Sequence, residues 1–202
     1  MTDAPEAKSD KNPHHHGNLR EVLIDAGLAI LADEGLSALT LRKAAARAGV
    51  SHAAPAHHFD GKTGLLAAIA TRGFATFTTY MKQDRYIHGT EPHDQIRGIG
   101  DGYLRFASDQ EALFRLIFNT DFKSQCDDPD LKQASKAAYN ELADVCALFE
   151  PSPLGTGVNE MAIWSLVHGY AGLRAFNKSI HPETGDTIPF EALLPPMQPR
   201  LP

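Results

Sequence analysis

Two short segments with helical periodicity, separated by a glycine-containing turn, lie between residues 40 and 58 of this 202-residue chain. Thr40 is suited to cap the first segment, and apolar residues follow it at helical spacing until Gly49. Ser51 is suited to cap the second, which we expect to be a short helix over residues 52–58. Two short helices joined by a turn of a few residues are typical of a helix-turn-helix. No other feature of the sequence restricts the fold as strongly.

Helical periodicity also precedes and follows this motif. A first helix is expected over residues 19–34, and no segment shows the alternating pattern of a half-buried strand. Turn-forming residues separate the later helical segments, which we expect at about residues 62–84, 93–108, 110–119, 129–149 and 157–178. The prolines after Ile180 exclude a long helix at the end of the chain. The sequence therefore predicts an all-α fold.

Charge divides the chain into a small basic part and a larger acidic part. Residues 36–62 carry four lysines and arginines against Asp60 alone, whereas the whole chain has a net charge of −6 at pH 7. A basic module is the electrostatic pattern expected of a part that contacts nucleic acid. We predict a disordered arm over 1–17, a three-helix DNA-binding domain over 18–62, and a helical domain for ligand binding and dimerisation over 63–202.

The second short helix of a helix-turn-helix enters the major groove of DNA. Ser51, His52 and His57 offer hydrogen-bonding groups to base edges, and Ala53 and Ala54 are small enough to let the backbone approach thymine methyl groups. These residues are the candidates for sequence-specific contact.

Basic residues are placed at the starts of the flanking helices. Arg42 and Lys43 begin the helix before the turn, and Lys62 begins the helix after the motif. Exposed backbone N–H groups at helix N-termini attract anions, so we expect these three side chains to meet DNA phosphates. His58 follows on the chain beside Phe59 and is suited either to internal packing or to DNA contact.

The segment LTLRKAAARAGVSHAAPAHHFDGKTGLLAAI resembles the DNA-binding signature of the TetR family of bacterial transcription regulators. A Thr-x-Arg helix, an Ala-Gly-Val turn, a recognition helix ending in His-Phe and a lysine at the next helix start occur in the family's order, and the resemblance covers about residues 13–80. Ala56 stands where many members carry a tyrosine that reaches a phosphate, so that contact is missing or replaced by His57. The resemblance implies that the family's DNA-contact positions are filled here by Thr40, Arg42, Ser51, His52, Ala53, His57, His58 and Lys62.

The segment MAIWSLVHGYAGLRAF resembles the TetR C-terminal domain type named for its Trp, His and Gly, here Trp164, His168 and Gly169. Trp164 and His168 lie four residues apart on one helix face, which either borders a pocket or fills the core. Gly169 and Gly172 in mid-helix favour the close approach of another helix, as at a dimer interface. The resemblance implies that the last two long helices pair with those of a second copy. It also implies a small-molecule effector among Tyr103, Phe106, Phe114, Phe118, Phe122, Trp164 and His168.

The sequence gives no sign of a membrane segment, a metal site or a cofactor. No apolar run approaches the roughly 20 residues of a membrane span, and the first residues lack the apolar core of a secretory signal, so we expect a cytoplasmic protein. Cys126 and Cys146 have no thiol or histidine at metal-ligand spacing, and the histidine run 14–16 has no fourth ligand.

We predict a homodimeric regulator that binds palindromic, double-stranded operator DNA and is released by a small molecule; repression is expected, with activation as the alternative. Two other functions remain open at this stage. One is a helical adaptor that keeps the helix-turn-helix shape for protein contacts, and the other is a histidine-dependent hydrolase. The sequence contains no His-Glu-x-x-His motif, Gly-x-Ser-x-Gly elbow or phosphate loop, which favours a protein without enzymatic activity.

Overall fold

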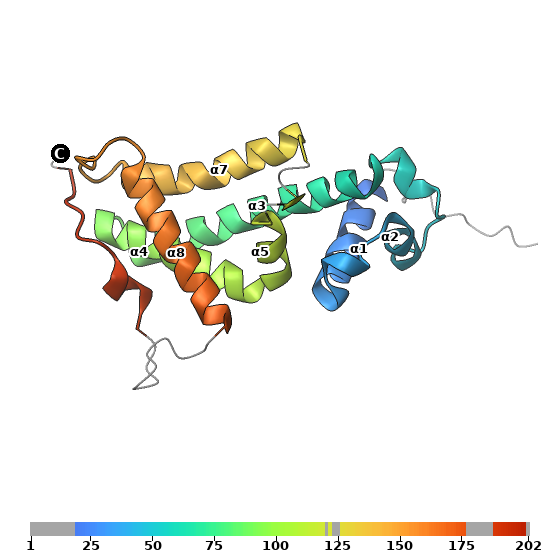
Figure 1. Cartoon of the computed structure of the whole chain (residues 1–202), viewed down its shortest axis with the longest axis horizontal. Helices are drawn as coiled ribbons and strands as arrows, with labels where there is room; N and C mark the ends of the chain where they lie inside the picture. The colour runs from blue at the N-terminus through green and yellow to red at the C-terminus, as the bar shows by residue number, and fades with distance from the viewer. Residues whose placement is uncertain (1–18, 120, 123–125, 177–187, 201–202) are drawn as a thin grey trace, which may run out of the picture. The chain divides into compact units, whose positions relative to one another are not determined.

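The computed structural model describes residues 19–119, 121–122, 126–176 and 188–200 (Figure 1). Its regular elements there are helices, so the predicted all-α fold is confirmed, while the predicted arm and the histidine run lie outside the described residues. The elements in order are α1 (Leu19–Glu34), η2 (Leu36–Ala38), α2 (Leu41–Arg47), η3 (Ala54–His57), α3 (Gly61–His88), α4 (Pro92–Asp109), α5 (Glu111–Ile117), α7 (Pro129–Cys146), α8 (Val158–Phe176) and η4 (Phe190–Leu193).

Helix α3 is longer than its sequence pattern predicted. The expected end near residue 84 missed the last turn. Its apolar residues Tyr86 and Ile87 are 82% and 78% exposed, so they do not continue the buried stripe of the helix. The helix ends before Gly89, whose φ of 127° lies in the region that favours glycine. The other long helices begin and end within a few residues of their expected bounds.

The segment expected to form a recognition helix over residues 52–58 is a turn followed by the short 3₁₀ helix η3. Pro55 explains the difference, because proline has no N–H to donate to the carbonyl four residues earlier, which belongs to Ser51. The backbone bonds there have 3₁₀ spacing instead: Ala54 N–H donates to the Ser51 carbonyl at 3.1 Å and Ala56 N–H to that of Ala53 at 3.2 Å.

The chain forms two compact units, and the boundary between them falls inside α3, between Leu65 and Leu66. In the first unit α1 packs against α2. Leu23, Ile30 and Leu39 are fully buried there. Burial of each such side chain stabilises the fold by about 1.5–3 kcal/mol. This small core fixes the position of α2, the helix before the turn, against α1.

In the second unit α4 contacts α5, α7, α8 and η4. Its glycines allow α3 to approach closely: a Cβ at Gly98 would lie 2.7 Å from the Arg85 Cα, and one at Gly102 would lie 2.6 Å from the Tyr80 carbonyl oxygen. Neither position was predicted from the sequence to be a helix contact. Their four-residue spacing puts both on one face of α4, which is the only signal that the sequence offers for this contact.

The C-terminal residues 188–200 pack along α4 and α8 (Figure 1, red). The Phe190 ring fills the space beside Gly100, where a Cβ would lie 2.1 Å from a ring carbon. The Tyr170 hydroxyl donates to the Ile188 carbonyl at 2.6 Å, and the Glu150 N–H donates to the Gln198 carbonyl at 2.8 Å. As expected for a proline-rich segment, the described part contains no more than the 3₁₀ helix η4. Among the described residues, none of the helices combines the length and the hydropathy of a membrane span.

Candidate DNA interface and ligand cavity

The first turn of α2 is fixed by its cap. Thr40 has extended backbone, with φ −138° and ψ 155°, and its side-chain oxygen accepts the Lys43 N–H at 3.1 Å. Capping of this kind stabilises a helix by about 1 kcal/mol. The Thr40 hydroxyl hydrogen is still available to an acceptor outside the chain. Arg42, in this first turn, is exposed.

The residues predicted to contact DNA lie at the surface of the first unit. Buried Pro55 and Phe59 anchor the segment that carries several of them. Lys43 is half-buried. Exposed residues occur on the first turn of α2, in the turn, on η3 and at the start of α3; they are Thr40, Arg42, Ser51, His52, Ala53, His57, His58 and Lys62.

The basic side chains of this unit differ in their partners. Lys43 forms an ion pair with Glu34, and the Arg47 Nη2 lies 2.5 Å from the Asp33 Oδ2. The structure gives Arg42 no ion pair within the described residues. Lys62 Nζ donates to the Leu36 carbonyl oxygen at 3.4 Å. The sequence did not indicate the two ion pairs, because their acidic partners lie on α1, away from the motif.

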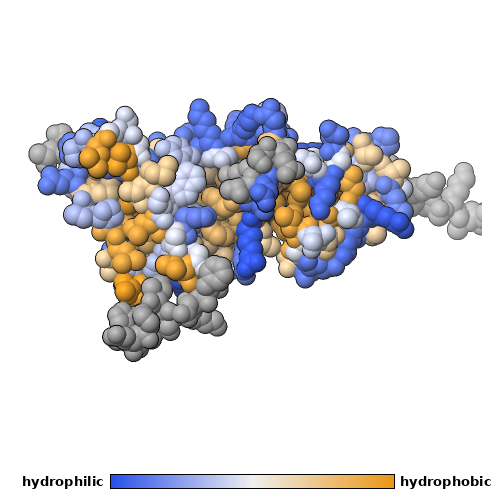
Figure 2. Space-filling view, in the orientation of Figure 1, coloured by the Kyte–Doolittle hydropathy of each residue, from blue (hydrophilic) through white to orange (hydrophobic). Residues whose placement is uncertain are grey.

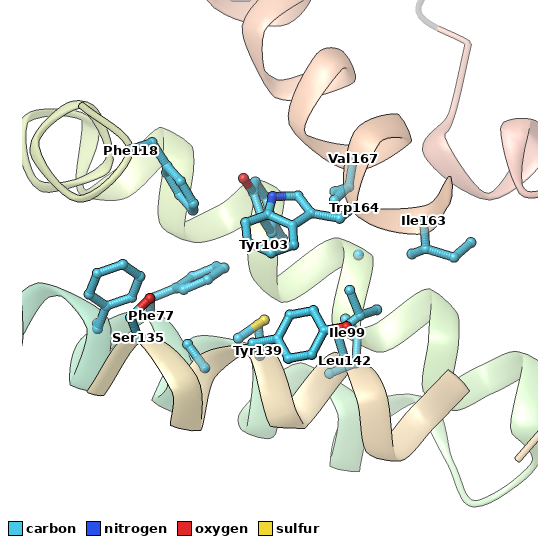
Figure 3. A pocket seen from close by; sticks show the side chains of 14 residues that line it. Phe77, Ile99, Tyr103, Phe118, Ser135, Tyr139, Leu142, Ile163, Trp164 and Val167 are labelled. Carbon is cyan, nitrogen blue, oxygen red and sulfur yellow. The ribbon is translucent and has the colours of Figure 1, made fainter. Parts of the chain in front are cut away.

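The second unit encloses a cavity of about 40 Å³ (Figure 3). Side chains from α3, α4, α7 and α8 surround it, together with Phe118 just after α5. None of them is acidic, basic or histidine. The lining residues are Phe74, Phe77, Met81, Ile99, Gly100, Tyr103, Phe118, Ser135, Ala138, Tyr139, Leu142, Ile163, Trp164 and Val167.

Of the residues expected around an effector, Tyr103, Phe118 and Trp164 line this cavity. Phe106 does not line it: its side chain is fully buried, and its ring packs on Phe77 with a centroid separation of 5.1 Å.

The other expected pocket residues also lie outside the lining. Phe114 and His168 stack behind the cavity wall, with the His168 ring centroid 5.6 Å from Phe114 and 5.0 Å from Phe118. Phe122 is buried. The lining residues on α3 and α7 were missed because apolar spacing along one helix does not distinguish a cavity wall from ordinary core.

A hydrogen bond ties the cavity wall to the residues behind it. The Tyr103 hydroxyl lies 2.6 Å from Nδ1 of His168, on α8. Burial raises the pKa of Tyr103 far above its ordinary value, although the hydrogen-bonding side chain of Trp164 opposes the rise. Tyr103 is therefore a neutral phenol at physiological pH. Figure 3 shows its hydroxyl beside the indole nitrogen of Trp164.

The outward face of α8 is partly apolar. Met161 and Leu173 are 62% and 60% exposed, and hydrophobic residues gather over α8 in Figure 2. A Cβ at Gly169 or Gly172 would meet nothing within 4 Å. The close helix approach that these glycines favour is therefore not made within the described chain.

The described residues contain no group of three or more histidines, cysteines or acids that could hold a metal ion. Burial, with the nearby Glu160, raises the pKa of the Cys146 thiol to about 12. Cys146 is thus a buried, protonated thiol at neutral pH, which suits a place in the core.

Two family models match this chain. The model described as bacterial regulatory proteins of the tetR family matches residues 23–69, which include the helix-turn-helix. The model described as a tetracyclin repressor-like C-terminal domain matches residues 96–194. It does not single out the type named for Trp, His and Gly, so that subtype stays a prediction.

Curated relatives agree with these matches. The chain is 28% identical over 131 residues to the HTH-type transcriptional regulator BetI of Stenotrophomonas maltophilia, covering 64% of this chain and 66% of that protein, just under two thirds. It is also 28% identical over 170 residues to an uncharacterized HTH-type transcriptional regulator from the dhlA 5' region of Xanthobacter autotrophicus, covering 83% of each chain.

Among solved structures, a protein of unknown function from Rhodococcus sp. RHA1 is similar over 91% of this chain and 93% of its own. The TM-score is 0.73 and the sequence identity is 25%. The same arrangement of helices therefore occurs in another protein along nearly its full length.

Proposed function

Because this chain belongs to the TetR family of bacterial transcription regulators, we propose that it binds operator DNA as a homodimer and releases it when a small molecule fills the cavity of the second unit. One observation carries the proposal. The turn and η3 expose a set of hydrogen-bonding residues. Along the chain this set is preceded by Arg42 and followed by Lys62, two cations that make no ion pair within the described residues.

In this proposal Ser51, His52 and His57 reach base edges in the major groove, and Ala53 allows the backbone to come close. The short η3 limits the number of base contacts, so phosphate contacts supply much of the affinity.

Phosphate contacts come from Arg42 and Lys62, and the hydroxyl of the cap Thr40 adds a donor. Lys43 joins them only after leaving Glu34, and His58, exposed beside Phe59, offers a further ring N–H donor.

Dimerisation is proposed to use the outward face of α8 together with α7. The exposed Met161 and Leu173 would be buried against a second copy, and the open positions at Gly169 and Gly172 would let the two helices approach closely. A twofold dimer presents two recognition segments, which matches a palindromic site with half-site centres one helical turn or a simple multiple apart.

Helix α3 is proposed to carry the signal. It is one continuous helix that holds Lys62 in its first turn and Phe74, Phe77 and Met81 on the cavity. A ligand that pushes these side chains apart displaces the helix on which Lys62 lies. A 100-fold loss of operator affinity requires the ligand to favour the DNA-incompetent state by about 2.7 kcal/mol, and DNA must weaken ligand binding by the same factor.

We propose repression rather than activation, and we expect the protein in the cytoplasm, where bacterial chromosomal DNA lies. A footprint on the DNA that flanks its own gene tests the function. Protection of two symmetric half-sites is expected. Absence of any salt-dependent duplex binding would overturn the proposal and favour a protein-binding adaptor.

The dimer is tested by Met161→Glu, which puts a charge into the proposed interface. We expect sedimentation of the wild type as a dimer at micromolar concentration and of this variant as a monomer that has lost the two-half-site footprint. Ile87→Glu is the matched control, because Ile87 is an exposed apolar residue of α3. A wild type that sediments as a monomer, or a control that loses the dimer equally, would contradict this assignment.

A further inference from the structure

We infer that the effector of this protein is an uncharged, mainly apolar molecule that reaches the cavity beside Tyr139. The inference rests on the proposed function, because it specifies the ligand of the proposed effector site. It follows from the chemistry, the size and the exposure of the residues that line the cavity.

The chemistry of the lining excludes a charged ligand. No acidic or basic side chain borders the cavity, and its side-chain polar groups are the hydroxyls of Tyr103, Ser135 and Tyr139 and the indole N–H of Trp164. An ion placed among these groups would lose its water without gaining a counter-charge, which costs more than hydroxyl dipoles return. A neutral molecule loses far less hydration free energy when it enters the cavity.

The hydrogen-bonding capacity of the lining limits the ligand to few polar groups. The hydroxyl of Tyr103 is already bonded to His168. Within the described residues, no hydrogen bond of the structure uses the hydroxyl of Ser135 or Tyr139. These two hydroxyls, both on α7, are the ones available to a hydroxyl or carbonyl group of the ligand.

The size of the cavity requires it to expand for a ligand, and the exposure of its lining residues indicates where it opens. At about 40 Å³ it is far smaller than the roughly 300–1,000 Å³ of typical ligand pockets, so a ligand must displace lining side chains. Met81 is unbranched and adapts readily to a changed space. Tyr139, at 39% exposed, is the most accessible of the lining side chains, and its ring centroid lies 5.9 Å from that of Trp164. Figure 3 shows both side chains on the cavity. Rotation of the Tyr139 side chain opens the cavity to solvent.

Trp164 makes the site directly observable, because it is the chain's single tryptophan and its indole lines the cavity. Its one indole N–H cross-peak in a ¹H–¹⁵N spectrum of the full chain therefore reports occupancy. We would titrate three probes of matched shape at pH 7: 4-phenylbutanol, 4-phenylbutyrate and 4-phenylbutylammonium. Saturable shifts are expected with the alcohol, at a Kd at least about tenfold below that of either ion. An ion that binds as tightly as the alcohol, or an alcohol that leaves the peak unmoved, would overturn the inference.

A pair of variants localises the binding. Ala138→Leu fills the cavity from α7, where Ala138 is buried, and should abolish the shift caused by the alcohol. Ala75→Leu makes the same change at an exposed position of α3 and should leave the Kd unchanged. Circular dichroism checks that both variants are folded. If Ala138→Leu is unfolded, Val167→Phe fills the cavity from α8 and serves the same purpose. Equal binding by folded cavity-filling and control variants would show that the probe binds elsewhere and would overturn the inference.

Fluorescence anisotropy of labelled flanking DNA, measured on the same samples, separates this inference from the proposed function. Alcohol binding without DNA binding would contradict the proposed function and leave the ligand chemistry standing. DNA binding without alcohol binding would contradict the ligand chemistry and leave the regulator standing.

Discussion

The two units of this protein present their candidate sites in opposite ways. The first displays polar and basic residues within 23 positions of sequence, from Thr40 to Lys62, and nearly all of them are exposed. The second surrounds its cavity with residues spread from Phe74 to Val167, and nearly all of them are apolar and withdrawn from solvent. A local motif suits a ligand with a regular, charged surface, whereas a cavity built by distant helices suits a small molecule enclosed on all sides.

The two units should also differ in how strongly substitutions at their candidate sites affect stability. Exposed contact residues can change with little loss of fold stability, because surface substitutions usually alter it by no more than about 0.5 kcal/mol. Residues that set the spacing between helices around the cavity are proposed to determine both stability and ligand specificity. Substitutions in the two units should therefore separate binding from stability in the first unit and couple them in the second.

The largest effect is expected where α3 and α4 touch. Gly102→Ala places a Cβ 2.6 Å from the Tyr80 carbonyl oxygen, and this backbone atom cannot move aside without shifting the helix. We expect the free energy of unfolding to fall by about 3 kcal/mol in urea denaturation.

Gly169→Ala is the matched control for this glycine, since its Cβ meets nothing within 4 Å. Measured in the Met161→Glu background, where no dimer contact contributes, it should leave stability unchanged or raise it by up to about 1 kcal/mol. Similar losses in both variants would show that helix spacing does not set the stability of the second unit.

An intermediate effect is expected at His52 on operator discrimination. Replacing the exposed His52 by Ala should cost about 1–3 kcal/mol per contact at one base position in each half-site, because one base edge loses its partner. Binding to a panel of single-base operator variants would measure it. A uniform loss across all positions would assign His52 to the backbone instead, and unfolding stability should not change.

A smaller effect is expected from the hydrogen bond behind the cavity wall. Tyr103→Phe removes the hydroxyl bonded to His168 and should lower the free energy of unfolding by about 1 kcal/mol. Tyr139→Phe removes a hydroxyl from a partly exposed ring and should change it by less than about 0.5 kcal/mol. Equal effects in thermal and urea unfolding would show that the 2.6 Å contact does not stabilise the fold.

The smallest effect is expected for Lys43→Ala. Its ion pair with Glu34 joins two side chains that are each about two-fifths exposed, so water screens it, and the loss of stability should stay below about 1 kcal/mol. Operator affinity should fall less than for Lys62→Ala, because Lys43 must leave its carboxylate to reach DNA. A larger loss of affinity at Lys43 than at Lys62 would reverse the order that the structure indicates.

The sequence predicted the first unit better than the second, for a physical reason. A helix-turn-helix is specified by neighbours along the chain, such as the cap Thr40 and Gly49, whose φ is 69°. Its deviation was local as well, since the missing N–H of Pro55 turned the expected helix into η3. Even here the partners of Lys43 and Arg47 lie on another helix, and no pattern around the turn indicated them.

In the second unit the helices were predictable from periodicity, but their neighbours were not. Gly98 and Gly102 show their importance only once α3 lies against them. Phe106 and Phe118 have similar aromatic character in the sequence, yet one fills the core and the other borders the cavity. Only the packing of several helices decides between the two places, and no single segment contains that information.

The salt dependence of operator binding decides whether Arg42 and Lys62 of each protomer hold DNA phosphates. Anisotropy titrations between about 50 and 200 mM salt would compare wild type, the double variant Arg42→Ala/Lys62→Ala, and Arg115→Ala, an exposed residue of the second unit, as control. We expect the double variant to lose about 4 from the slope of log Kobs against log salt, one phosphate contact for each of the four side chains replaced in a dimer, while the control keeps the wild-type slope. An unchanged slope in the double variant would contradict this expectation.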